Sequence, residues 1–145
     1  MRDGPEVEFE RTRAHHPAIA LDPVNGSIVV AWVRSEPTGA GGCSGDVRYR
    51  TLAGGHWSTT RDVPTPSCAG PIDLAVRDGR LTVAIALQQI EYERIAIVAG
   101  RPGHWTMSYL GDDPAGGLPI DFANTPALDL DAAGRPSVAY LKGQW

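Results

Sequence analysis

Two adjacent histidines, His15 and His16, are the side chains of this sequence best suited to acid–base chemistry near neutral pH. They stand just before an alternating apolar segment at residues 18–22. Neighbouring imidazoles could bind a metal ion or transfer protons. We favour the alternative, a solvent-exposed pair in a loop. The sequence also contains no Cys/His spacing typical of a metal site.

Asp73 and Asp129 occupy the same position in two similar segments, each between two aliphatic residues, and Ala20 stands at that position in a third. Because side chains alternate along a strand, we expect both carboxylates to face a channel, opposite the apolar set. There they could bind a cation or share a proton. We favour two ionised carboxylates in a wet channel, because no positioned partner accompanies them.

Further candidate ligand-binding residues lie in long segments that we expect to be loops. They are Glu91, Tyr92, Glu93, Arg94, Asp112, Asp113 and Asp121. Together they could bind a sugar or a cation, and solvated loop charge is the alternative. Their spacing does not match a calcium-binding loop, so the sequence predicts no metal and no cofactor. Three tryptophans, Trp57, Trp105 and Trp145, each follow a Gly-x pair and could stack on sugars or pack in the core.

The elements that must position these residues repeat along the chain. Turn glycines occur at Gly26, Gly79 and Gly134, 53 and 55 residues apart. Five residues after each glycine comes an alanine, followed by Trp32, Ile85 or Tyr140. Apolar runs flank each turn, which predicts β-hairpins. A period in this range indicates a repeat architecture.

The repeat predicts four antiparallel strands per unit of about 50 residues, and no window has helical periodicity. The expected strands are 18–22, 27–33, 46–52 and 56–63, then 72–76, 81–87, 94–99 and 104–110, with two more in a third unit. Residues 11–16 are expected to be a connection. We therefore expect an all-β fold made of β-propeller blades. A β-sandwich need not repeat internally.

The expected boundaries are blade 1 at about 16–63, blade 2 at about 70–110, and a partial blade 3 at about 125–145, so about 2.5–3 blades. A strand at 6–9 would complete a blade. Propellers need about four to eight blades. We therefore expect either part of a longer protein or one protomer of a multi-chain ring, a homo-oligomer. A chain that stops at Trp145, within a blade, favours truncation or strand exchange.

The blade pattern resembles that of sialidase-like or BNR-repeat propellers. It consists of a Pro-apolar-x-apolar-Asp strand, a Gly turn, an Ala-aromatic strand and a late Gly-x-Trp. The stricter Asp-box, Ser-x-Asp-x-Gly-x-x-Trp, does not occur. The sequence is also similar to BNR-type polysaccharide lyases, which implies a reactive histidine at His16, or at His15 beside it. Arg34-Ser35-Glu36 stands where such enzymes tend to carry a second histidine. Multi-chain rings are found among small fucose-binding propeller lectins, which a dimer of this chain would resemble.

Composition and net charge limit the classes of partner that this chain could bind. Hydrophobic content of 42% and charged content of 21% favour a folded domain. A net charge of −4 argues against binding nucleic acid or anionic membranes. No apolar run is long enough to span a bilayer, and the first residues show no apolar signal-peptide segment.

The two cysteines, Cys43 and Cys68, fall in Gly/Ser/Pro-rich segments that the propeller arrangement places on one face of adjacent blades. We predict that they form a disulfide, which requires a Cα separation below about 7 Å. Two free loop thiols are the alternative. A bonded pair implies a secreted or periplasmic protein, and free thiols imply a cytoplasmic one.

The long connections at 34–45, 64–70, 88–93 and 111–125 all fall on one face of the expected propeller, where function usually resides. The sequence therefore favours a recognition module over an enzyme without deciding between them, with carbohydrate as the leading ligand class. The alternatives are a piece of a BNR-like glycosidase or polysaccharide lyase, and a protein-interaction scaffold.

Overall fold

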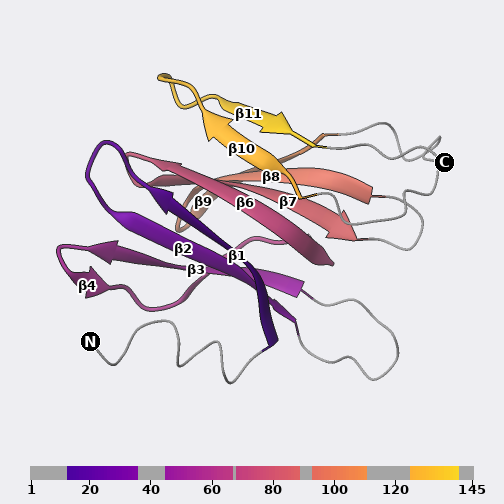
Figure 1. Ribbon diagram of the computed structural model, residues 1–145, viewed down its shortest axis with the longest axis horizontal. Helices are drawn as coiled ribbons and strands as arrows, with labels where there is room; N and C mark the ends of the chain where they lie inside the picture. Colours follow the sequence, from indigo (N-terminus) through magenta and orange to yellow (C-terminus); the bar gives the residue numbers. More distant parts are fainter. Residues whose placement is uncertain (1–12, 36–44, 67, 89–92, 111–124, 141–145) are drawn as a thin grey trace.

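The computed structural model describes residues 13–35, 45–66, 68–88, 93–110 and 125–140, and the regular elements of these residues are all β-strands in antiparallel sheets. Figure 1 shows three sheets stacked one above another. No helix in this part of the chain is long and apolar enough to cross a membrane. The predicted all-β class is therefore confirmed.

The first sheet contains β1 (Arg13–Leu21), β2 (Ile28–Ser35), β3 (Gly45–Ala53), β4 (His56–Trp57) and β5 (Arg61–Val63). Its order is β1-β2-β3-β4, and β5 also pairs with β3. The second sheet contains β6 (Ala69–Arg77), β7 (Arg80–Gln88), β8 (Glu93–Arg101) and β9 (His104–Leu110), in sequence order. The third sheet pairs β10 (Ala127–Leu130) with β11 (Pro136–Ala139).

The second sheet lies between the other two, and β7 and β8 are buried on both faces, whereas β9 is largely exposed. One face joins the larger hydrophobic cluster, to which the first sheet contributes Val29, Ala31, Val33, Val47, Tyr49 and Val63, and the second sheet Ile72, Leu74, Val76, Leu81, Val83, Ile85, Leu87, Ala96 and Val98. The other face places Ala84, Ala86, Ile95 and Ile97 against the third sheet's Leu128 and Val138. Alternate residues of β7 and β8 thus serve opposite faces, which explains why both strands are almost continuously apolar.

Tight turns close the hairpins where the sequence predicts them. Gly26 and Gly79 have φ of 72° and 68°, which an L-residue rarely adopts, and nothing lies within 4 Å of where a Cβ would be. Glycine is therefore needed at these positions for its backbone conformation, and not because a side chain would clash. The Asn25 side chain supports its turn by accepting the Ser27 N–H at 2.9 Å.

Asp22 joins the first two sheets at these turns. The Val24 N–H (2.9 Å) and the Asp78 N–H (3.0 Å) donate to Oδ1 of Asp22, and the Gly79 N–H (2.7 Å) donates to Oδ2. The residue is fully buried. Burial alone would raise the pKa of Asp22, but the N–H groups of Gly79, Val24 and Asp78 favour the anion and hold the pKa below its usual value.

Two expected boundaries are wrong. Residues 11–16 were expected to form a connection, but β1 begins at Arg13 and contains both histidines, with a register shift between His15 and Ala18. The expected strand 56–63 is divided into β4 and β5. At the break, the Ser58 N–H donates to the Thr51 carbonyl at 2.8 Å, and the Thr51 N–H donates to the Ser58 hydroxyl at 3.0 Å. These local hydrogen bonds take the place of regular pairing with β3 at this point.

The expected strand 6–9 and Cys43 lie outside the described residues. Cys68 is not a free thiol. The two sheets also approach closely beside it, because a Cβ added to Gly45 would lie 2.8 Å from the Ala69 carbonyl oxygen. This approach favours the Cys43–Cys68 pairing, which stays a prediction.

We expect Asp22→Asn to lower the free energy of unfolding by about 2 kcal/mol at pH 7, because two sheets lose a charged acceptor for buried N–H groups. The lowered pKa adds a pH dependence. Asp22 contributes fully to the free energy of unfolding above the pKa of its carboxyl in the unfolded chain, near 3.8. This contribution is lost as the pH falls through the pKa of Asp22 in the folded protein. Urea unfolding at pH 7 and pH 3 should therefore show a smaller difference between the two proteins at pH 3.

The matched control is Asp62→Asn, which removes an exposed carboxylate paired with Arg48 at 3.2 Å. This change should cost no more than about 1 kcal/mol. Equal losses for the Asp22 and Asp62 variants would contradict the role assigned to Asp22.

Candidate functional site

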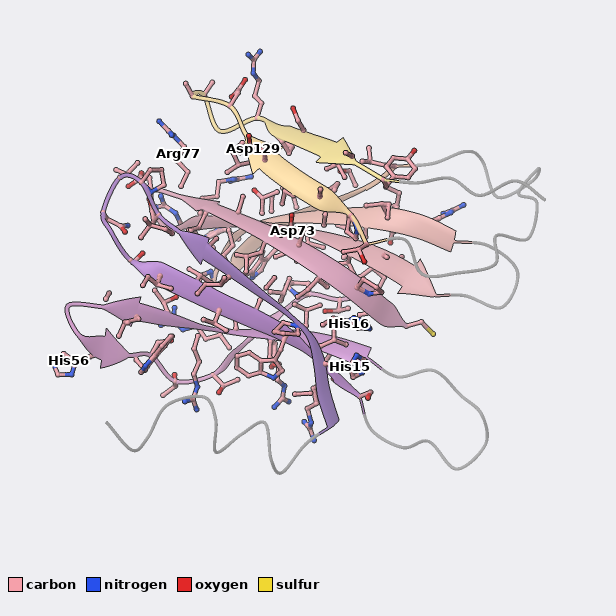
Figure 2. All side chains as sticks on the ribbon, in the orientation of Figure 1. His15, His16, His56, Asp73, Arg77 and Asp129 are labelled. Atoms are coloured by element: carbon pink, nitrogen blue, oxygen red, sulfur yellow. The ribbon has the colours of Figure 1, made fainter. Side chains whose placement is uncertain are left out.

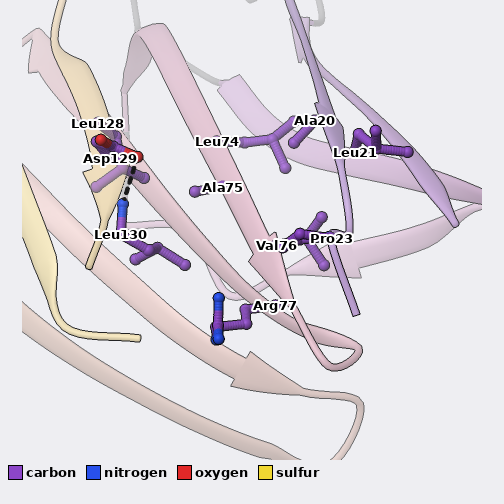
Figure 3. Close-up of a pocket in the computed structure, with 10 residues that line it drawn as sticks. All are labelled: Ala20, Leu21, Pro23, Leu74, Ala75, Val76, Arg77, Leu128, Asp129 and Leu130. Carbon is purple, nitrogen blue, oxygen red and sulfur yellow. Dashed lines mark hydrogen bonds between the residues drawn. The ribbon is translucent and has the colours of Figure 1, made fainter. Parts of the chain in front are cut away.

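A pocket of about 230 Å³ lies where the first strands of the three sheets come together. Figure 3 shows its lining residues, which belong to β1, β6 and β10 and the turn after β1. They are Ala20, Leu21, Pro23, Leu74, Ala75, Val76, Arg77, Leu128, Asp129 and Leu130. Arg77 and Asp129 are the charged members. The pocket is otherwise aliphatic, so it could hold a small ligand with an apolar body and one polar group.

Asp73 is not one of the residues that line this pocket. Its Oδ1 accepts the Leu74 N–H at 2.9 Å, and its Oδ2 accepts the Leu128 N–H at 2.7 Å. Leu128 belongs to the third sheet, so the carboxylate fastens β10 to β6. Figure 2 shows Asp73 on the second sheet, below Asp129 on the third.

Asp129 repeats half of this arrangement. Its Oδ1 accepts the Leu130 N–H at 2.8 Å, as Asp73 accepts that of Leu74. Asp129 is exposed and stands on the outermost described sheet. The two carboxylates therefore hold equivalent positions, as their spacing predicts. Asp73 connects two sheets and Asp129 lines the pocket, while the expectation of a channel that both face stays a prediction.

His15 and His16 lie together at the start of β1, at the end of the sheet opposite the β1–β2 turn (Figure 2). Their rings meet edge to face with centroids 4.7 Å apart. His15 Nε2 lies 2.9 Å from the Ser35 hydroxyl. His16 has φ of 54°, in the left-handed region, at the register shift of β1. Both side chains are half-buried rather than fully exposed as expected.

The environment of His16 favours the neutral ring. Burial lowers the pKa of His16, and the charge of His15 lowers it further. A neutral imidazole at near-neutral pH can accept a hydrogen bond from a hydroxyl group or accept a proton. This chemistry suits either ligand binding or general-base catalysis.

A second polar cluster lies at the corresponding end of the second sheet. The Arg94 guanidinium stands 5.8 Å from the centroid of the Tyr109 ring, within range of a cation–π contact. Tyr109 is 49% exposed, and its hydroxyl donates to Met107 Sδ at 3.2 Å. Arg94 was predicted as a binding residue and Tyr109 was not. An exposed aromatic at the end of a strand, beside a loop, is the signal that could have identified it.

The remaining loop candidates cannot be placed. Glu91, Tyr92, Asp112, Asp113, Asp121 and Trp145 lie outside the described residues, and of Glu93 only the backbone, at the start of β8, is described. Trp105 packs against the larger core cluster and meets Tyr49 edge to face at 6.4 Å. Its periodic position therefore serves packing rather than sugar stacking.

Sequence reasoning also missed the role of Asp22. This residue ends an apolar strand before a turn, and Asp131 recurs in the same place in the third unit. An aspartate before a turn usually bonds to its own turn, as Asp131 does with the Ala133 and Arg135 N–H groups at 2.9 Å. The recurrence therefore identifies a turn residue but not a contact between sheets.

Within the described ranges, no cluster of three or more His, Cys, Asp or Glu side chains could hold a metal ion. Comparisons with protein families, with curated proteins and with solved structures give no match to this chain.

Asp73→Ala should release the third sheet from the second. The Leu128 amide loses its carboxylate acceptor, so we expect its hydrogen exchange to accelerate about tenfold, equivalent to about 1.4 kcal/mol. Amides of β2 and β3 in the first sheet should keep their rates. Two-dimensional NMR would measure both sets, and an unchanged Leu128 rate would contradict the role given to Asp73.

Proposed function

We propose that this chain is a segment of a β-propeller, and that the end of the sheets opposite the tight turns is a recognition surface for carbohydrate. The observation that carries the architecture is the convergence of β1, β6 and β10. These are the first strands of three sheets whose order follows the sequence, and together they line one pocket. That arrangement is expected of blades placed around a common axis.

The junctions between sheets support the same interpretation. Asp22 binds the β6–β7 turn from the first sheet, and Asp73 binds β10 from the second. Each junction therefore forms between the first hairpin of one sheet and that of the next. A sandwich of two face-to-face sheets would not require each sheet to contact the next one through its first hairpin.

The proposed recognition surface contains the two polar clusters described above. His15, His16 and Ser35 form one, and Arg94 with Tyr109 forms the other. Sugars present hydroxyl groups beside C–H faces, so they are bound by polar hydrogen-bonding groups next to aromatic rings. Exposed Tyr109 supplies such a ring, and the neutral His16 supplies a hydrogen-bond acceptor.

A glycan array probed with the full chain tests the proposal, followed by calorimetry with the best glycan. We expect Tyr109→Ala to weaken binding about tenfold or more, because it removes the stacking ring. Tyr109→Phe should retain most of the affinity, since the ring remains. The matched control is His56→Ala, because His56 is exposed on β4, beside the tight turn at the far end of the sheet (Figure 2).

Binding without turnover would support a recognition module. Equal affinity in the wild type and Tyr109→Ala would contradict the proposed surface, and the absence of any glycan bound by the folded chain would contradict the ligand class.

A further inference from the structure

At both junctions between sheets, alanines of one sheet pack in the same cluster as large aliphatic side chains of the next. At the first junction, Ala18, Ala20 and Ala31 of the first sheet belong to the cluster that contains Ile72, Leu74 and Val76 of β6. At the second junction, Ala84 and Ala86 of β7 lie in the cluster that contains Leu128 and Val138. Larger side chains accompany these alanines, so the contrast between small and large side chains is clearest at the first strands, where Ala18 and Ala20 of β1 meet Ile72 and Leu74 of β6.

The outer face of β1 carries large aliphatic side chains that are uncovered, whereas Trp32 on the same face of β2 is buried. Ala18 and Ala20 pack inward, so the alternating Ile19 and Leu21 point to the opposite face. Ile19 is 69% exposed and Leu21 is 64% exposed. Two adjacent large aliphatic side chains this exposed on one strand are unusual for a completed surface.

The outer face of the third sheet carries mostly small side chains. Leu128 and Val138 pack inward, and the alternating positions hold the exposed Ala127, Asp129, Ser137 and Ala139. Asp129 occupies the position that Asp73 occupies in the second sheet. Asp73 uses its Oδ2 to accept an N–H from the next sheet, whereas the Oδ1 of Asp129 accepts the N–H of its own neighbour Leu130.

We propose that two copies of the chain associate head to tail, with the outer face of the third sheet of one copy packed on the outer face of the first sheet of the other. At each joint, Ile19 and Leu21 of one copy cover Ala127 and Ala139 of the second copy. Asp129 accepts the backbone N–H of Ile19 across the joint. This inference rests on the propeller arrangement proposed above.

The proposed hydrogen bond from the Ile19 N–H to Asp129 is assigned from equivalent positions in the repeat. Leu128, the donor to Asp73, follows Pro126-Ala127, and Ile19 follows Pro17-Ala18. Leu128 pairs with Val138 as Ile19 pairs with Val30, so the two residues hold the same place on the first strand of their hairpins. The described residues of two copies supply six sheets, which falls within the four to eight blades of closed propellers, whereas those of three copies would supply nine.

Light scattering coupled to size-exclusion chromatography, over a range of chain concentrations, tests the association. The full chain should show twice its mass of 15.4 kDa. Ile19→Glu places a carboxylate opposite Asp129 and should raise the dimer dissociation constant at least tenfold. Met107→Glu is the matched control, because Met107 is 40% exposed on β9 in another sheet, and it should remain dimeric. Circular dichroism checks that each variant folds.

A mixing experiment tests the head-to-tail pairing. Asp129→Lys alone should also dissociate, because a cation then faces Ile19. Mixed with Ile19→Glu, it should restore a dimer, since one joint is native and the other pairs Lys with Glu. Failure of the mixture to associate would overturn the proposal.

A monomeric wild type at every concentration would also overturn it, and would leave another part of a longer chain as the cover for these faces. A monomer that still binds glycan through Tyr109 would keep the proposed function while the dimer fails. A dimer that binds no glycan would do the opposite.

Discussion

The structure depends on the burial of one sheet between two others. β7 and β8 place alternate side chains on opposite faces, and both faces are covered: one by the first sheet and one by the third. Burial of aliphatic area is the main stabilising contribution available to a chain of this composition. The two core clusters meet on opposite faces of the second sheet, so this sheet is the element that fixes the order of the three sheets.

Carboxylates supplement this packing at the first strands. Asp22 and Asp73 each accept backbone N–H groups from a neighbouring sheet, at the turn end and at the middle of the strand respectively. A buried N–H without an acceptor is costly, so these bonds fix the relative position of sheets that apolar packing alone would leave free to slide. The two polar clusters lie at the end of the sheets opposite the tight turns. Their relative position therefore depends on contacts formed far from them.

The sequence predicted the strands and their grouping well, because alternation and turn glycines are local signals. Gly26, Gly79 and Gly134 identify the hairpins, and the recurring alanines after them identify the repeat. It could not predict what Asp22 and Asp73 bind, because their partners lie 55 to 57 residues away in sequence. The break between β4 and β5 was missed because it depends on a side-chain hydrogen bond between Ser58 and Thr51, which β-propensity does not encode.

Native-state hydrogen exchange of the backbone amides tests most directly whether the second sheet is enclosed on both faces. The account predicts that the slowest amides are those of Val83 to Leu87 and Ile95 to Val98, exchanging only when the whole chain unfolds. Amides of β10 and β11 should exchange faster through local opening. Exchange of β7 and β8 as rapid as that of β10 would contradict the account, because it would place the middle sheet at a surface.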